Sequence, residues 1–474
     1  MLGVLRELLS AWLFGTGLVA NSYRLSQSAY LIPLHGFVSD AVNGGFSPRF
    51  SVLKSTDPIK ARALFAWLHL ILLVLSIVVA AFLVVFSTQW ARFLAPGFGP
   101  SAIALSSDFI RVLAISLPSY AVVSLYSAVD LSAGSGAISA ARASIQSLGL
   151  IIGTLLAWLM GQPLFIAGGF VVAYFLLSFW GARVALGHGM SFSVFDCFNN
   201  ARSELIDVWR SFRTLIWIPV LLQVHQTIER QVASIVHPDA ISALDYARFV
   251  SDTLVVLVAV PFATAGLSTM ARMSDAEFIA GASRSFRVLL LIGVPVSAIF
   301  FQGSEFIVRL LFQRGAFGEG SVLITSDLMA ALSVGVWGQL IGYAGGRFLS
   351  ARARNAEVLV ITAISVFANI AVNLSLAREF GVATMGVAAA VNGILFGGLA
   401  LWRVGLDKSC FKFLLQVIFF AVLYCLLVQL LFSFSDGVFS FFGVTALFWL
   451  FVLFSSRRMK DVFLDLLAIL RRGQ

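Results

Sequence analysis

The sequence contains little charge and no long polar stretch. Only 12% of its 474 residues are Asp, Glu, Lys or Arg, against roughly 25% in an average soluble domain. The longest polar stretch, around residues 187–202, is too short to bury a hydrophobic core of its own. Because 59% of the residues are hydrophobic, the composition predicts a polytopic membrane protein without a soluble domain.

The sequence also lacks the residue patterns of metal and nucleotide sites. Its three cysteines, Cys197, Cys410 and Cys425, form no CxxC pair, so we interpret them as apolar packing residues. No GxxxxGKS or GxxxxGKT loop is present, which argues against direct use of ATP. We therefore expect no metal and no cofactor.

Apolar segments of about 20 residues, the length that crosses a bilayer, recur along the whole chain. Two segments near the start, residues 2–19 and 22–42, are more polar, so we expect helices that line a water-filled cavity. The total is about fourteen transmembrane helices, the first of them short. The twelve clearest segments lie at about 63–90, 109–131, 139–160, 163–186, 208–235, 245–271, 286–312, 322–350, 357–377, 382–404, 412–433 and 436–455.

The 32 lysines and arginines follow a pattern that indicates membrane topology. Twenty-three lie in alternate breaks between apolar segments, beginning after the second segment and including Arg142. Since basic loops stay in the cytoplasm, both termini are expected there, and nucleic acid is not an expected partner. The opposite breaks hold Arg92, Arg111, Arg248, Arg309, Arg314 and Arg378.

Both ends of the chain fit this topology. Residues 2–19 show no cleavable signal peptide, because Arg6 and Glu7 interrupt the apolar run. Residues 459–470 have apolar side chains at helical spacing and basic ends. They are expected to lie along the cytoplasmic membrane surface or to extend the last helix.

Four sequence blocks carry a family resemblance. The first is LFQRGAF, residues 311–317, where Gly315 permits a tight reversal and Arg314 can keep its stem in lipid and its head in water. The others are RELLSAWLFGTG with GGFSPRF, IERQVASIVHPDAISALDYA, and RFLSARARNAEVLVITAISVFANIAVNLSLAREFGVATMGVAAAVNGIL, at residues 6–17 with 44–50, 228–247 and 347–395. In this order they resemble the MviN/MurJ family, the proposed lipid II flippases of bacterial cell-wall synthesis, within the multidrug/oligosaccharidyl-lipid/polysaccharide exporter superfamily.

The sequence departs from the family pattern at several positions. Met1 lies only five residues ahead of Arg6, so either the start is mis-assigned or the first helix is truncated. Asn21 stands where family members usually have an acidic residue. The basic residues expected after the proline of the second helix are replaced by Leu34, His35 and Gly36, and a YADR-like end reads YARF, with the arginine at Arg248. Fewer cavity cations therefore remain than the family pattern implies.

The resemblance implies an all-α polytopic fold with two helical lobes around a central cavity. Residues 1–190 would form the first lobe with helices 1–6, residues 200–405 the second with helices 7–12, and residues 411–474 two additional helices with a cytoplasmic amphipathic tail. It also implies a flippase, not an enzyme. This flippase would carry lipid II across the bacterial inner membrane by alternating access, in peptidoglycan synthesis and hence cell shape. Its partners would be the polyprenyl-pyrophosphate-linked saccharide and membrane lipids, with coupling to an ion gradient or the membrane potential.

Arginines inside apolar segments are the candidates for binding a pyrophosphate, because bare charge in hydrocarbon is too costly. Arg6 and Arg24 are the first choices, with Asn21 close by in the sequence. The alternative for Arg24 is an interfacial position. Glu229 and Arg230 also lie within an apolar segment and point about 100° apart, so either one faces the cavity or neighbouring helices hold both.

Other motif residues are expected to shape the fold. Arg314, Gly315 and Phe317 belong to the predicted outer turn, whereas Asn369 and Asn373 would contact ligand or bond between helices. Small residues on the tenth predicted helix allow close packing or a hinge. They include Gly335, Gly338 and Gly342.

Alternative functions remain open from the sequence. The reduced set of cations is compatible with a flippase for a polyprenyl-linked exopolysaccharide or O-antigen unit. A membrane glycosyltransferase would need acidic or histidine residues gathered in an outer loop, and the predicted outer loops are short. An inactive scaffold is the third alternative.

Overall fold

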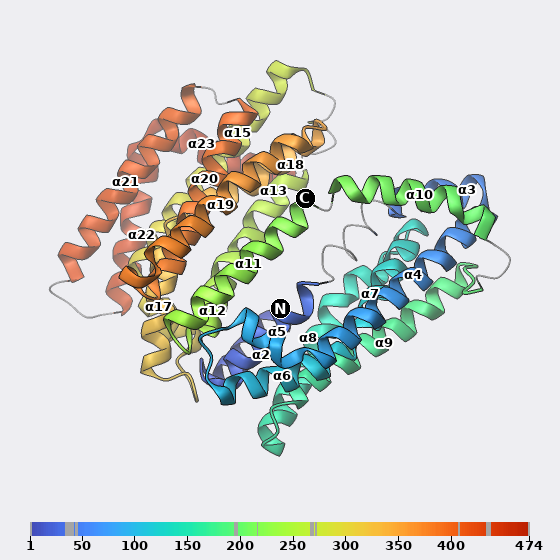
Figure 1. Cartoon of the computed structure of the whole chain (residues 1–474). Helices are drawn as coiled ribbons and strands as arrows, with labels where there is room; N and C mark the ends of the chain where they lie inside the picture. Colours follow the sequence, from blue (N-terminus) through green and yellow to red (C-terminus); the bar gives the residue numbers. More distant parts are fainter. Residues whose placement is uncertain are drawn as a thin grey trace. The chain divides into compact units, whose positions relative to one another are not determined.

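Helices are the only regular elements in the part of the chain that this computed structural model describes (Figure 1). The described residues are 2–33, 42, 46–193, 198–215, 217–265, 270, 273–405, 408–432 and 438–472. The chain divides into two compact units. Unit 1 contains Met1–Ser242 and Arg314–Gly318, and unit 2 contains Ala243–Gln313 and Glu319–Gln474. The predicted all-α class is confirmed, while the predicted lobe boundaries stay predictions.

Unit 1 is built from helices that follow one another along the first half of the chain. They are α1 (Leu2–Phe14), α2 (Leu18–Leu31), α3 (Ser47–Thr56), α4 (Pro58–Val85), α5 (Ser87–Leu94), α6 (Pro100–Ala114), α7 (Leu117–Ser132), α8 (Ala137–Met160), α9 (Phe165–Gly187), α10 (Phe198–Leu215) and α11 (Trp217–Val236). Within this unit, α4, α7, α8 and α9 run alongside one another, and α3 and α10 both contact α4 (Figure 1).

Unit 2 contains the helices of the second half, and α12 begins at its border. They are α12 (Ala240–Leu254), the π-helix η2 (Val255–Ala259), α13 (Val260–Ala265), α15 (Asp275–Gln302), α16 (Ser304–Phe312), α17 (Glu319–Ser333), α18 (Val336–Ala351), α19 (Asn355–Phe380), α20 (Ala383–Val404), α21 (Lys408–Phe432), α22 (Val438–Ser455) and α23 (Arg457–Arg472). Helix α15 packs against both α18 and α21. The rings of Phe286 and Phe348, tilted by 48° with centroids 5.5 Å apart, join α15 to α18.

Eight helices of the described part are long and apolar enough to cross a membrane, or up to eleven if three bent pairs each count as one span. Helices α1 and α2 are shorter, with 13 and 14 residues. The prediction of two more polar helices ahead of the clear spans, the first of them short, therefore agrees with the observed elements, although α2 begins at Leu18 and not at residue 22. The prediction of about fourteen transmembrane helices concerns the whole chain.

Several segments predicted as single helices are broken. The segment at 109–131 is α6 followed by α7, with a 45° bend between them, because Pro118 in the first turn of α7 has no N–H to continue the helix. The segment at 322–350 is α17 and α18, bent by 52°. In the segment at 63–90, α4 ends at Val85 and a separate short helix, α5, begins at Ser87.

Two helix pairs approach closely at glycines. In unit 1, a Cβ atom added to Gly169 of α9 would lie 2.0 Å from the Gly149 carbonyl oxygen of α8. In unit 2, a Cβ on Gly338 of α18 would lie 2.1 Å from the Gly393 carbonyl oxygen of α20. Small residues permit such backbone contact between membrane helices. A Cβ on Gly335 would lie 2.5 Å from the Ala390 carbonyl oxygen, and one on Gly342 would lie 2.1 Å from Phe396 Cδ1. All three glycines are closely packed, and a hinge there stays a prediction.

The C-terminal helix changes direction sharply. The axes of α22 and α23 differ by 98° at the break before Arg457. Helix α23 is therefore not a straight extension of α22, which was one of the two alternatives for residues 459–470. Its position along the cytoplasmic membrane surface stays a prediction.

Candidate functional site

Helices α1 and α2 form a hairpin whose turn is built from glycine. Gly15 has φ +55°, a left-handed conformation that glycine adopts without a Cβ penalty. Gly17 is the N-cap of α2, and the Asn21 amide group donates to its carbonyl oxygen at 3.1 Å. This turn fixes the register in which the charged residues of α1 and α2 face each other.

Arg6, Glu7 and Arg24 form a charged cluster on this hairpin. Glu7 is 3% exposed, and its carboxylate accepts hydrogen bonds from Arg6 Nε at 3.1 Å and from an Arg24 Nη atom. The side chain of Arg24 is 10% exposed, whereas that of Arg6 is 24% exposed. Two guanidinium groups share one carboxylate, so the cluster has a net positive charge and Arg6 keeps N–H groups accessible.

The structure brings together Arg6 and Arg24, which the sequence singled out separately, and adds Glu7. Sequence reasoning did not include Glu7 in the site. The available signal was an acidic residue directly beside Arg6 inside an apolar segment, where an unpaired charge is costly.

A further cation, Arg142, lies among tyrosines within unit 1. Its guanidinium carbon is 4.8 Å from the ring centroid of Tyr120 and 5.7 Å from that of Tyr174, distances at which cation–π attraction is substantial. It also donates to the Tyr174 hydroxyl and to Ser124 Oγ, each at 3.3 Å. Within the described residues no acidic side chain pairs with Arg142, so the charge is held by rings and hydroxyls.

The sequence placed Arg142 in a cytoplasmic break, but it lies inside α8, in the second turn. Its tyrosine partners come from α7 and α9, the helices directly before and after α8. A lone arginine flanked by small residues gives no sign of such partners, and only the folded arrangement of the three helices reveals them.

Asn21 forms hydrogen bonds with the segment that joins α11 to α12 and with the first turn of α12. Its Oδ1 atom accepts the backbone N–H of Ser242 at 2.9 Å, and its amide group donates to the Asp239 carboxylate at 3.2 Å. Burial raises the pKa of this Asp239 carboxyl above its ordinary value. The described bonds of Asn21 are thus structural, and a substrate contact stays a prediction.

Glu229 and Arg230 are both buried on α11, with 1% and 9% exposure. Arg230 donates to the carbonyl oxygen of Ile241 at 3.3 Å, which ties α11 to the following segment. In unit 2, Asn373 donates to Asn369 Oδ1 at 2.8 Å, so the two asparagines bond to each other along α19. Roles of these four residues in substrate binding stay predictions.

Residues 314–317 of the LFQRGAF motif belong to unit 1 and lie against the α1–α2 turn. The Ala316 N–H donates to the Trp12 carbonyl oxygen at 2.8 Å. Gly315 has φ +57°, and a Cβ there would lie 2.3 Å from Trp12 Cδ1. A Cβ on Gly15 would lie 2.4 Å from the Ala316 carbonyl oxygen. Phe317 is buried and Arg314 is exposed, so the two positive-φ glycines let the two turns interlock.

Metal-ligating side chains do not gather in the described part of the chain. No group of three or more His, Cys, Asp or Glu residues there could hold a metal ion. At the α1–α2 hairpin the polar chemistry is instead that of two guanidinium groups and the buried Glu7 carboxylate.

Comparison with protein families and curated proteins gives consistent matches. A family model described as lipid II flippase MurJ matches residues 10–454. The chain is 25% identical to a probable lipid II flippase MurJ from Rhizobium meliloti (strain 1021), over 85% of this chain and 78% of that protein. It is 24% identical to a probable lipid II flippase MurJ from Helicobacter pylori (strain J99 / ATCC 700824), over 51% and 54% of the two chains.

Solved structures show the same fold. A lipid II flippase MurJ in an inward closed conformation superposes with a TM-score of 0.84 at 19% identity, covering 98% of this chain and 97% of that one. An inward-facing MATE family multidrug resistance transporter superposes with a TM-score of 0.71 at 12% identity, covering 87% and 96%.

Proposed function

The chain belongs to the MurJ family of lipid II flippases, and we propose that it carries lipid II from the inner to the outer leaflet of the bacterial inner membrane. The observation that carries this proposal is the match to the family along residues 10–454. The protein is a transporter of peptidoglycan synthesis. Its cargo would be the polyprenyl-pyrophosphate-linked saccharide, and the polyprenyl tail would stay in the membrane.

The Arg6–Glu7–Arg24 cluster supports binding of the pyrophosphate. The head group must cross a hydrocarbon layer of roughly 30 Å, where unpaired phosphate charge is prohibitive. Guanidinium groups bind phosphate oxygens in pairs, and the partly exposed Arg6 has N–H groups to offer. Glu7 holds Arg24 in place and neutralises one of the two positive charges, which keeps the affinity low enough for the cargo to leave.

Arg142 supports the same role from α8. A pyrophosphate carries more than one negative charge, and the α1–α2 cluster has a net charge of only one. The Arg142 guanidinium is held by tyrosine rings and not by a carboxylate, so its charge is available to an anion. We infer that alternating access exposes these cations first to the cytoplasmic and then to the outer side.

The proposed topology places both termini in the cytoplasm. The excess of lysine and arginine in alternate breaks supports this orientation. With it, the α1–α2 turn and the LFQRGAF segment lie on the outer side, and α3, α10 and α23 lie on the cytoplasmic side. Coupling to an ion gradient or the membrane potential would supply the driving force.

A polyprenyl-linked exopolysaccharide or O-antigen unit is the second candidate cargo. It is favoured by the departures from the family pattern, such as Asn21 in place of an acidic residue. The substituted positions 34–36 lie outside the described residues. A membrane glycosyltransferase does not agree with membership of a flippase family.

Complementation separates these cargoes. We expect the chain to restore growth to a bacterium depleted of its own lipid II flippase, and Arg24→Ala to abolish the rescue. The matched control is Arg183→Ala, because Arg183 is an exposed arginine on α9. Absence of rescue, with the protein detected in the membrane, would contradict lipid II as cargo and favour the second candidate.

A scaffold without transport activity predicts a different pattern. Such a protein would tolerate alanine at Arg6, Arg24 and Arg230, provided that it still reaches the membrane. Rescue by all three variants, with lipid II movement absent in proteoliposomes, would establish the scaffold and reject transport.

A further inference from the structure

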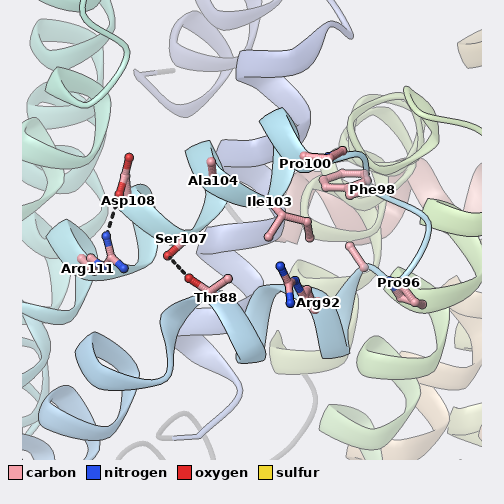
Figure 2. A pocket seen from close by; sticks show the side chains of 11 residues that line it. Thr88, Arg92, Pro96, Phe98, Pro100, Ile103, Ala104, Ser107, Asp108 and Arg111 are labelled. Carbon is pink, nitrogen blue, oxygen red and sulfur yellow. Dashed lines mark hydrogen bonds and ion pairs between the residues drawn. The ribbon is translucent and has the colours of Figure 1, made fainter.

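A groove between α5 and α6 has a volume of about 570 Å³ and is lined by residues of unit 1 alone (Figure 2). One wall is the face of α5 that carries Thr88 and Arg92, four residues apart. The other wall is the face of α6 that carries Ser107 and Arg111, also four apart. Residues at this spacing lie on the same side of a helix, so each helix contributes one hydroxyl and one arginine.

Hydrogen bonds connect the hydroxyls at the bottom of the groove. Thr88 Oγ1 lies 3.0 Å from Ser107 Oγ, which in turn donates to Ser87 Oγ at 2.8 Å. Arg111 Nε donates to the same Ser87 oxygen at 3.0 Å. In Figure 2 the Thr88 and Ser107 pair lies between Arg111 and Arg92. The polar part of the groove is therefore ordered before any ligand arrives.

The groove has an excess of positive charge. Asp108 accepts one bond from Arg111 Nη1 at 3.0 Å and neutralises that arginine in part. Arg92 is exposed, and among the described residues no hydrogen bond or ion pair is observed for it. The N-terminus of α6, at Pro100, also lines the groove, and its helix dipole favours negative charge. An anion with several acceptor oxygens fits these donors.

The surroundings of the groove are apolar. Val85, Phe86 and Phe93 beside it are 68%, 45% and 52% exposed. Trp90 stacks on Phe93 with ring centroids 5.4 Å apart and donates its indole N–H to the Ala29 carbonyl oxygen at 3.1 Å. Tryptophan is enriched at the boundary between lipid and water. In the proposed topology this boundary is the outer one.

We propose that the groove between α5 and α6 binds the phosphate group of an anionic phospholipid. The phosphate oxygens accept from Arg92, from the remaining N–H groups of Arg111 and from the Thr88 hydroxyl, while the acyl chains follow the exposed apolar side chains of α4 and α5. This site is separate from the α1–α2 cluster that would hold the cargo, and its lipid would secure the short helix α5 at the membrane surface.

The test is native mass spectrometry of the full-length protein in detergent, titrated with phosphatidylglycerol or phosphatidylcholine. We expect tighter binding of phosphatidylglycerol. Arg92→Gln removes one positive charge and should lower the affinity for phosphatidylglycerol about fivefold. Asp108→Asn removes the competing carboxylate and should raise that affinity. The matched control Arg378→Gln, an exposed arginine at the end of α19, leaves it unchanged.

Several outcomes would overturn the site. Equal binding of the two lipids, or an equal effect of Arg92→Gln and Arg378→Gln, contradicts it. Competition by inorganic phosphate without any preference between the lipids shows a small-anion site instead. If Arg92→Gln yields no folded protein, Asp108→Asn still tests the site: tighter binding of phosphatidylglycerol supports it, and unchanged or weaker binding contradicts it. Binding is measured without transport, so failure here and failure of the proposed flippase function are distinguishable.

Discussion

The Glu7 carboxylate sets the charge that the α1–α2 hairpin presents. It is buried and accepts from both Arg6 and Arg24. Removing one partner of a buried ion pair leaves an imperfectly compensated charge, which is far more destabilising than loss of a surface pair. Arg6 and Arg24 are therefore structural partners of Glu7 as well as candidate ligands of the cargo.

Arg24→Ala is expected to lower the unfolding free energy by about 3 kcal/mol, because Glu7 keeps only the more exposed partner, Arg6. Adding Glu7→Gln to this variant should restore part of the loss, since no buried charge then remains to be compensated. Unfolding in mixed detergent, followed for the two single variants and the double variant, measures the coupling. Additive effects of the two substitutions would contradict the pairing.

Gly315→Ala is expected to destabilise unit 1. The left-handed backbone costs an alanine about 1–2 kcal/mol, and the added Cβ would meet the Trp12 ring at 2.3 Å. The control is Gly318→Ala, because nothing lies within 4 Å of a Cβ at that position. Each variant is heated, and the fraction that remains monodisperse is measured against temperature. Equal midpoints for the two variants would show that the interlocked turns contribute nothing to stability.

The residues that the sequence identified are those whose signal is local. Arg6 and Arg24 stand out because charge is rare inside apolar segments, and Gly315 because a tight reversal needs glycine. Glu7 was passed over although it is adjacent to Arg6, and Arg142 was assigned to a loop. Arg24, which bonds to Glu7, and the tyrosines around Arg142 come from other helices, and one sequence does not show which helices become neighbours.

At the scale of elements, helix pairs such as α8 and α9 are held by backbone contact at glycines. The apolar segments at 139–160 and 163–186 predicted both helices with ends close to those observed. The same apolar pattern predicts one helix where the structure has two at α4 with α5 and at α6 with α7, because the apolar run continues through the break. Hydropathy measures the cost of water contact and not the geometry of the chain, so a break such as the one at Pro118 does not appear in it.

Gly169→Ala is expected to separate α8 from α9, because the added Cβ would lie 2.0 Å from the Gly149 carbonyl oxygen. Overpacking of this kind costs about 1–3 kcal/mol. The adjacent Gly168→Ala is a matched control, since nothing lies within 4 Å of its Cβ. The midpoint of unfolding in detergent should fall for Gly169→Ala only. A fall for Gly168→Ala as well would point to helix propensity rather than to the contact between α8 and α9.

At the scale of the whole molecule, composition alone predicted the class of the protein, and the resemblance of four blocks predicted its family. Both are confirmed by the match along residues 10–454 and by the shared fold. The orientation in the membrane depends on the distribution of lysine and arginine, which is a property of the whole chain and not of a single loop.

Cysteine labelling tests this orientation. With Cys197, Cys410 and Cys425 replaced by serine, Gly318→Cys should react with a membrane-impermeant maleimide in intact cells. Ser55→Cys, an exposed position on α3, should react only after permeabilisation. The reverse pattern would invert the topology and place the groove between α5 and α6 on the cytoplasmic side.

The segment Arg314–Gly318 belongs to unit 1, although the residues on both sides of it belong to unit 2. The Trp12 carbonyl that accepts from Ala316 is therefore synthesised about 300 residues before its donor. At roughly 5–20 residues per second, the interval is on the order of 15–60 s. Throughout that time the Trp12 carbonyl lacks its Ala316 N–H donor, so the first hairpin to be made is among the last parts of the molecule to be completed.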